Sequence, residues 1–268
     1  TYLRRNPPYQ CKNTNYESVA ELRLVRGAEL SVLFGDDANL NGILDSNEND
    51  GDISTPSDNR DGRIDPGLLE FFTVHTRQVI GTNVNNPEQL AALLGERLSS
   101  DRANQILQVT NQSVTNVLQF FILSGMTREE FEPIEGFLIG TETNGLINVN
   151  TASEAVLRCV PGIGTERAPS LVSYRQSNPD LHTVAWVAEV LERDIALQVA
   201  PYLTGRSFQF TADIAAVGHH GRGYRRVKFI LDTSEGTPRI RYRQDLTSLG
   251  WALGRQVRES LTLVKDIR

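Results

Sequence analysis

An Asn- and Asp-rich stretch near the N-terminus has side-chain oxygens at the spacing of a calcium-binding loop. The pattern reads DANLNGILDSNE from Asp37. Calcium takes hard oxygen ligands, and such a loop supplies them from its first, third, fifth, seventh, ninth and last positions around a glycine turn. The predicted ligands are the side chains of Asp37, Asn39, Asn41, Asp45 and Glu48 and the carbonyl of Ile43. The stretch therefore predicts a Ca²⁺ site, with a solvated acidic linker as the alternative.

A weaker copy of the pattern follows directly. It has Gly62 at the turn, but Ser57 and Leu68 stand where the first and last carboxylates belong. Acidic residues outside the register could complete this second site. Its candidate ligands are Asp50, Asp52, Asp58, Asn59, Asp61, Asp65 and the carbonyl of Arg63. Since the flanks lack the long helix pair of a calcium sensor, we expect structural rather than switching calcium.

Residues 145–174 have the pattern of a helix-hairpin-helix unit. An extended lead precedes Thr151, which is predicted to cap the first helix with Glu154 as its capping-box partner. Gly162 and Gly164 bracket Ile163 in the hairpin between the two helices. Such a hairpin can hold a phosphate on its backbone N–H groups, or serve as a packing block.

An earlier segment repeats this design. Residues 83–85 and residues 148–150 both read NVN, and an apolar helical pattern follows each of them. The first copy lacks the Gly-x-Gly hairpin, so the repeat did not retain a phosphate grip. The charges around the second hairpin are balanced, whereas nucleic-acid binding needs clustered Lys and Arg. The pattern favours a structural or protein-docking block.

Bulk composition agrees with that interpretation. The chain has 268 residues, a net charge of -6 and a pI near 5.3, which disfavours nucleic acid and anionic membranes as partners. No apolar run approaches the roughly 20 residues of a membrane span. Thr1 is not an initiator Met, so we expect a processed or truncated chain. Cys11 and Cys159 have no metal-ligand spacing, and both a disulfide and two free thiols remain open.

The periodicity predicts an α+β chain in four parts. A short amphipathic helix is expected at residues 17–27, further helices within 87–132, including 113–123, and another over 184–199. From residue 207 the period changes to two, which predicts three antiparallel strands at 207–216, 224–231 and 240–246. The expected parts are an N-terminal segment 1–35, a calcium-binding insertion 36–67, a helical domain 68–204 and a β-sheet 205–268.

Catalysis has little support in the sequence. His75, His182, His219 and His220 lie in no catalytic or zinc motif. Asp213 and Asp232 fall on predicted strands, where we expect surface carboxylates rather than a catalytic pair. We therefore expect a chain that is not an enzyme.

Four segments carry a resemblance to a known family: GLINVNTASEAVLRCVPGI (145–163), SGMTREEFEPIEGFL (124–138), YESVAELRLVRG (16–27) and PPYQCKN (7–13). Together they resemble general secretion pathway protein K, the large minor pseudopilin of type II secretion systems. The resemblance implies a pilin-like antiparallel sheet with a large inserted helical domain of two helix-hairpin-helix-like (SAM-like) repeats. It also implies a non-enzymatic subunit at the pseudopilus tip that caps or initiates the filament.

The same resemblance implies partners and a location. The partners would be minor pseudopilins I and J and, as a further option, secreted substrates. The subunit would lie in the periplasm or cell envelope, anchored in the inner membrane through an N-terminal helix that this sequence lacks. The insertion 36–65 is longer and more like a calcium loop than the family leads us to expect. Two alternatives remain: an extracytoplasmic DNA-binding helix-hairpin-helix receptor, and a calcium-dependent adhesion module.

Overall fold

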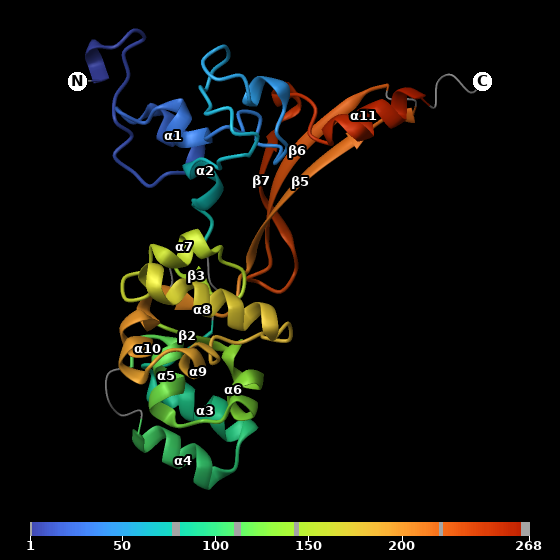
Figure 1. Ribbon diagram of the computed structural model, residues 1–268. Coiled ribbons are helices and arrows are strands. Elements are labelled where there is room, and N and C mark those ends of the chain that lie inside the picture. Colours follow the sequence, from blue (N-terminus) through green and yellow to red (C-terminus); the bar gives the residue numbers. More distant parts are fainter. Residues whose placement is uncertain (1, 77–80, 110–113, 142–144, 220–221, 264–268) are drawn as a thin grey trace. The chain divides into compact units, whose positions relative to one another are not determined.

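The computed structural model describes residues 2–76, 81–109, 114–141, 145–219 and 222–263 (Figure 1). Its contacts divide the chain into two compact units. The first unit comprises residues 1–74, 214–227 and 245–268, and the second comprises residues 75–213 and 228–244. Each unit thus combines segments that are distant in sequence.

The described chain contains short helices and short strands. The α-helices are α1 (Leu30–Phe34), α2 (Leu68–Phe71), α3 (Pro87–Arg97), α4 (Ser100–Val109), α5 (Val117–Ser124), α6 (Arg128–Glu135), α7 (Glu154–Arg158), α8 (Gly164–Ser177), α9 (Val187–Val190), α10 (Arg193–Val199) and α11 (Gly254–Leu263). The strands are β1 (Thr82–Asn83), β2 (Leu138–Ile139), β3 (Ile147–Asn148), β4 (Leu203–Thr204), β5 (Gln209–Val217), β6 (Tyr224–Asp232) and β7 (Arg239–Asp245). Among these helices, none is long and apolar enough to cross a bilayer.

The second unit contains two segments with the same order of parts. One runs from β1 through α3–α6 to β2, and the other runs from β3 through α7–α10 to β4. In each segment the first and last strands pair in parallel. Asn83 Oδ1 accepts the N–H of Asn85 at 2.9 Å, and Asn148 Oδ1 accepts the N–H of Asn150 at 2.9 Å. The NVN match in the sequence therefore corresponds to one local turn, built twice.

One apolar core fills this second unit, and both segments contribute to it. The stretches that carry the family resemblance contribute eight of its buried side chains. Their core side chains are Met126, Phe131, Ile134, Leu138, Val149, Leu157, Val160 and Ile163, each at most 5% exposed. Burial of this apolar surface is the main term that stabilises the short helices, which would be marginal in isolation.

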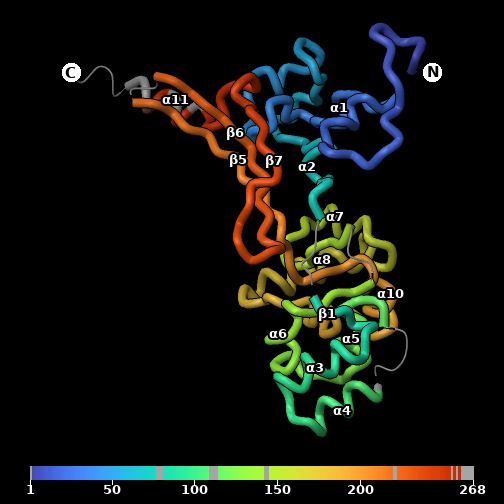
Figure 2. The backbone as a smooth tube through the Cα atoms, turned by 180° about the vertical axis from the view of Figure 1, so that it is seen from behind, coloured from blue at the N-terminus to red at the C-terminus, as the bar shows by residue number. Residues whose placement is uncertain are grey.

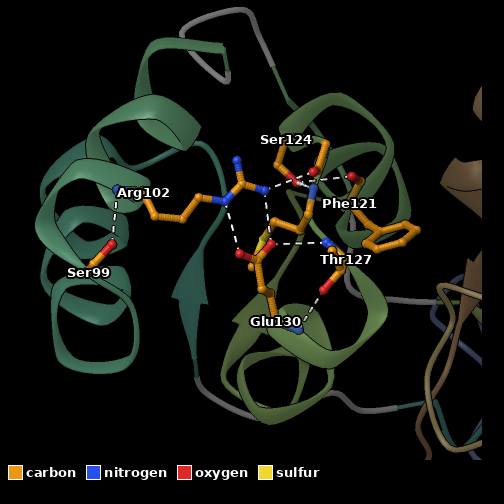
Figure 3. Close-up of polar contacts among 8 residues, drawn as sticks. Ser99, Arg102, Phe121, Ser124, Thr127 and Glu130 are labelled. Carbon is orange, nitrogen blue, oxygen red and sulfur yellow. Dashed lines mark hydrogen bonds and ion pairs between the residues drawn. The ribbon is translucent and has the colours of Figure 1, made fainter.

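A two-pronged ion pair ties α4 to α6 (Figure 3). Arg102 Nε donates to Glu130 Oε1 at 3.0 Å, and Arg102 Nη2 donates to Glu130 Oε2 at 2.9 Å. The same guanidinium donates to the carbonyl of Gly125 at 2.9 Å. Glu130 also accepts the N–H of Thr127, whose side chain caps α6 in return. This network fixes the start of α6 against α4.

The C-terminal sheet has three strands in the order β5-β6-β7, which run side by side in Figure 2. The change of period at residue 207 thus predicted the sheet correctly, with strand ends displaced by one or two residues. The apolar alternation of β5 does not mark a buried face, because Phe210 is 49% and Ile214 53% exposed.

Several local expectations differ from the structure. Residues 17–27 contain a 3₁₀ helix, Val19–Leu24, with no buried residue, because the segment finds no core to pack its apolar stripe. Helix α7 is capped by Ser153 rather than Thr151, since the Asn148 turn occupies the backbone before it. Helix α5 begins at Val117, and position 113 lies outside the described residues.

Asp232 is also not the surface carboxylate that we expected. It is 3% exposed and accepts hydrogen bonds from Ser234, Gln209 and Arg241. These donors hold the pKa of Asp232 well below its usual range despite burial. A carboxylate at the end of a strand is buried here because its neighbours satisfy both of its oxygens.

Candidate metal-binding loops

The first predicted loop closes around Asp37. Asp37 Oδ1 accepts the N–H of Asn41 at 2.9 Å, and Asp37 Oδ2 accepts the N–H of Gly42 at 2.8 Å. Two residues of this turn adopt positive φ, Leu40 at 54° and Gly42 at 70°. The glycine meets that requirement without strain, whereas Leu40 is held there by its surroundings.

Glu48 reaches back into the same loop. Its Oε1 accepts the N–H of Ala38 at 3.0 Å, and its Oε2 accepts the N–H of Asp45 at 3.0 Å. The residue is only 2% exposed, and this burial raises the pKa of its carboxyl above the usual range. The last position of the pattern is therefore a buried acid that faces the first positions.

The two asparagines share one acceptor. Asn39 Nδ2 and Asn41 Nδ2 donate to Asp45 Oδ2 at 2.8 and 3.1 Å. Asn41 Oδ1 accepts the N–H of Ile43 at 2.7 Å. Asn39 Oδ1 is buried and accepts no hydrogen bond from any described residue. A buried oxygen without a donor is costly, and it stands at a predicted ligand position. The donor set of carboxylate and amide oxygens fits calcium.

The second loop repeats the geometry of the first. Asn59 Nδ2 donates to Asp65 Oδ2 at 3.0 Å, as Asn39 does to Asp45. Arg60 and Gly62 adopt φ of 57° and 76°, at the positions of Leu40 and Gly42. Asp61 Oδ1 accepts the N–H of Arg63 at 2.8 Å, as Asn41 does from Ile43. The weak sequence match therefore hides a close backbone match.

A residue that sequence reasoning missed takes over the first position of this second loop. Asn49 Oδ1 accepts the N–H of Gly62 at 3.2 Å, the role that Asp37 has for Gly42. Ser57 stands at the first position of the second loop pattern, but its short side chain is not a predicted ligand. Since Asn49 lies outside the register, spacing could not identify it.

The other candidate acids of the second site build turns. Asp58 Oδ2 accepts the N–H groups of Asp50 and Gly51, each at 2.8 Å. These bonds, with a third from Arg60 N–H, outweigh desolvation and lower the pKa of Asp58. Asp50 Oδ1 accepts the N–H of Ser54 at 3.0 Å. Asp52 is exposed. The structure thus places Asn59, Asp61 and Asp65 in one loop. Asp50 and Asp58 belong to a neighbouring turn.

The two loops lie against each other. Asp36 N–H donates to the carbonyl of Asp65 at 3.0 Å, and Asp65 N–H donates to Asp36 Oδ2 at 3.1 Å. Gly35 and Pro66 form an antiparallel bridge there. A Cβ on Gly35 would overlap the Asp65 carbonyl, so only glycine allows this approach.

Carboxylates alone do not define the site. Among the residues that the structure describes, no group of three or more His, Cys, Asp and Glu side chains gathers as a metal cluster. In the first loop the predicted donors are half carboxylates and half amide and carbonyl oxygens. Such a mixed set fits calcium and disfavours zinc, which selects His and Cys.

The hairpin before α8 is formed as expected. Gly162 and Gly164 adopt φ of 96° and 61°, and Ile163 between them is 1% exposed. The nearby cations have partners within the fold. Arg158 pairs with Glu154, Arg167 donates to the Gly162 carbonyl, and Arg175 donates to the carbonyls of Val149 and Ala152. Cys11 and Cys159 are exposed free thiols.

The histidines form no shared site in the described structure. The His75 ring lies 6.3 Å from the Tyr242 ring and is tilted to it. Burial and, to a smaller extent, repulsion from Lys228 lower the pKa of His75. His182 and His219 are exposed, and His220 lies outside the described residues.

Comparisons with known proteins give two findings. The helix-hairpin-helix motif family matches residues 142–192, less than half of the chain. A chain from the crystal structure of the GspK-GspI-GspJ complex of the enterotoxigenic Escherichia coli type 2 secretion system is similar, with 12% identity and a TM-score of 0.23. That match covers 65% of this chain and 82% of the other. No curated protein matched. The chain thus contains a helix-hairpin-helix motif, and its likeness to the secretion-system structure is weak.

Proposed function

We propose that this chain is a structural minor pseudopilin that caps or initiates a type II secretion pseudopilus. The proposal rests on the position of the segments that resemble general secretion pathway protein K. The segments 124–138 and 145–163 supply eight of the buried side chains in the core of the second unit. The resemblance therefore concerns residues that determine a fold, and the step from fold to function is an analogy.

Two further features support a structural role. The C-terminal sheet is an antiparallel meander, the arrangement that the resemblance implies. Phe210 and Ile214 expose apolar surface on β5, where a partner subunit would cover it. In this role the bulk of the helical segments would block addition of a further subunit, so the protein would end or begin a filament rather than extend it.

Reconstitution tests this role. Co-expression with minor pseudopilins I and J of the same cell should give a stable complex with one copy of each on size-exclusion chromatography with light scattering. The major pseudopilin, offered in their place, is the control and should not form that complex. Long homopolymers of the chain alone, or no association with I and J, would contradict the proposal.

We further propose that loop 37–48 binds one Ca²⁺ and loop 57–68 a second. The first ion would be held by Asp37, Asn39, Asn41, Asp45, Glu48 and the Ile43 carbonyl. Bound calcium would neutralise these carboxylates and supply a partner for the buried oxygen of Asn39. The shared backbone of the second loop supports a second ion, with Asn49 beside Asn59, Asp61 and Asp65.

Titration calorimetry of the chelator-treated chain tests the calcium proposal. We expect two binding events for calcium, with affinities on the order of 10⁻⁵ to 10⁻³ M, and weaker binding of magnesium. A single binding event would support calcium binding by the first loop only. The absence of any heat that a chelator reverses would refute both sites.

The helix-hairpin-helix match supports one alternative, binding of duplex DNA through the hairpin. Its weakness is that Arg158, Arg167 and Arg175 already have partners in the fold. Salt-sensitive duplex binding that is lost in Gly164→Ala would favour this alternative. Gly95→Ala is the control, because Gly95 lies at an open position in the matching segment.

A further inference from the structure

A buried arginine of the C-terminal sheet forms hydrogen bonds with loop 37–48. Arg226 on β6 is 2% exposed. Its Nη1 donates to the carbonyl of Asn39 at 2.8 Å, and its Nη2 donates to the carbonyl of Leu40. These residues are more than 180 positions apart in sequence. A buried guanidinium is costly unless its donors are satisfied, so these bonds matter to both segments.

The peptide groups of Asn39 and Leu40, which Arg226 binds, determine the geometry of the loop. Leu40 is the non-glycine residue of this turn at positive φ, and Asn39 carries the buried oxygen without a donor. A planar guanidinium bonded to two successive carbonyls fixes the orientation of both peptide groups. This in turn fixes the directions of the Asn39 and Asn41 side chains at the third and fifth ligand positions. In the second loop the equivalent turn, Asn59–Arg60, is exposed instead.

The segment after β7 holds the same loop from another direction. Asn41 Nδ2 donates to the carbonyl of Trp251 at 3.3 Å. Ile43 lies close to Gly254, where a Cβ would come within 3.0 Å of Ile43 Cδ1. Arg226 is joined to this segment as well, because its carbonyl accepts the N–H of Leu246 at 2.8 Å. The loop and the sheet end within the first unit are therefore built as one network.

We propose that Arg226 is a positioning residue that couples ion binding in loop 37–48 to the order of residues 222–228, at the start of β6. The coupling rests on the proposed calcium site. The two loop carbonyls that Arg226 binds, those of Asn39 and Leu40, are not predicted ligands of the ion, so the ion would not compete for them. Calcium favours the turn that Arg226 recognises, and by linkage Arg226 favours the turn that calcium requires.

Hydrogen exchange of the full chain, with calcium and with chelator, tests the coupling. In the unmodified chain calcium should slow exchange in loop 37–48 and also in residues 222–228, the latter by about fivefold or more. In Arg226→Gln calcium should still slow exchange in the loop but should no longer affect residues 222–228. Arg225→Gln is the matched control, because Arg225 is its exposed neighbour, paired with Asp245, and should leave the coupling intact.

The outcomes separate this inference from the calcium proposal. Protection of the loop without protection of residues 222–228 in the unmodified chain would overturn the coupling and leave the calcium site standing. No calcium effect on either segment would overturn both. A purely structural arginine would change exchange equally with calcium and with chelator, and that result would also overturn the coupling. The unmodified chain decides the first two cases even if Arg226→Gln does not fold.

Discussion

Glu135 Oε1 accepts the backbone N–H of Val184 at 2.8 Å and so joins the end of α6 to the segment before α9. Glu135 Oε2 lies 3.6 Å from Arg206 Nε, and neither atom has a hydrogen-bond partner among the described residues. The carboxyl is thus buried with one oxygen satisfied and one not. Burial raises the pKa of Glu135 to about 7, although Val184 and Arg206 oppose the shift.

This pKa predicts a pH dependence of stability. Because the folded-state pKa exceeds the ordinary value of 4.5, the folded chain binds the proton more tightly than the unfolded chain does. The free energy of unfolding should therefore fall as pH rises from about 4.5 to about 7, by at most about 3 kcal/mol from this group. Urea unfolding between pH 4.5 and pH 8, followed by far-UV circular dichroism, measures the fall.

Glu135→Gln should remove this contribution, because the amide can still accept the Val184 N–H but does not ionise. Glu96→Gln is the control, since Glu96 is an exposed acid on α3 and does not act on Glu135. Equal pH profiles for Glu135→Gln and the unmodified chain would show that the buried carboxyl does not set the dependence.

Asn150 and Asn85 occupy matching turns but should differ in their effect on stability. Asn150 Nδ2 donates to the Gly205 carbonyl at 2.8 Å, and its Oδ1 accepts Trp186 Nε1–H at 2.7 Å. Asn85 is exposed. Asn150→Ala should cost about 2 kcal/mol by leaving these buried groups unpaired, and Asn85→Ala less than about 0.5 kcal/mol. Denaturant melts of both variants provide the comparison, and equal costs would contradict the assignment.

The ion pair between Arg102 and Glu130 should contribute measurably. Its side chains are 29% and 26% exposed, and its geometry is two-pronged. A double-mutant cycle with Arg102→Met and Glu130→Gln should give a coupling energy of about 1 kcal/mol. The exposed pair Arg225 and Asp245 should give a value near zero in a parallel cycle. Similar values for both pairs would mean that burial and geometry do not strengthen the first.

Calcium should raise the melting temperature of the chain, and Asp37→Ala should abolish the gain from the first loop. Asp37 is chosen because it would bind the ion and also closes the turn at Gly42. Glu70→Ala, an exposed acid outside both loops, should keep the full gain. Scanning fluorimetry with calcium and with chelator reads the difference. A gain in Asp37→Ala as large as that of the unmodified chain would place the first ion elsewhere.

A substitution in the second loop tests the second calcium site. Asp61→Ala should reduce the calcium stoichiometry from two to one while the first loop retains its affinity. Titration calorimetry measures both quantities. An unchanged stoichiometry would show that Asp61 does not hold an ion.

Periodicity and turn residues alone determined much of the local structure. The three C-terminal strands, the Gly162–Gly164 hairpin and the repeat at the two NVN segments were all predicted, because each depends on neighbours in sequence. The burial of those elements was not predictable in the same way. Phe210 and Ile214 alternate as core residues do and yet are exposed, since burial depends on what another part of the chain places opposite them.

The candidate site likewise has features that the sequence predicts and features that only the tertiary structure shows. Spacing predicted Asp37, Asn39, Asn41, Asp45 and Glu48 as calcium ligands, because the pattern of such a loop is a local feature. Only the tertiary structure showed that Asn49 replaces Ser57 in the second loop, and that Arg226 holds the first loop from a strand far along the chain. Sequence therefore determined which oxygens are available to an ion. Tertiary structure decided which of them are oriented together, because hydrogen bonds between distant segments fix the direction of each side chain.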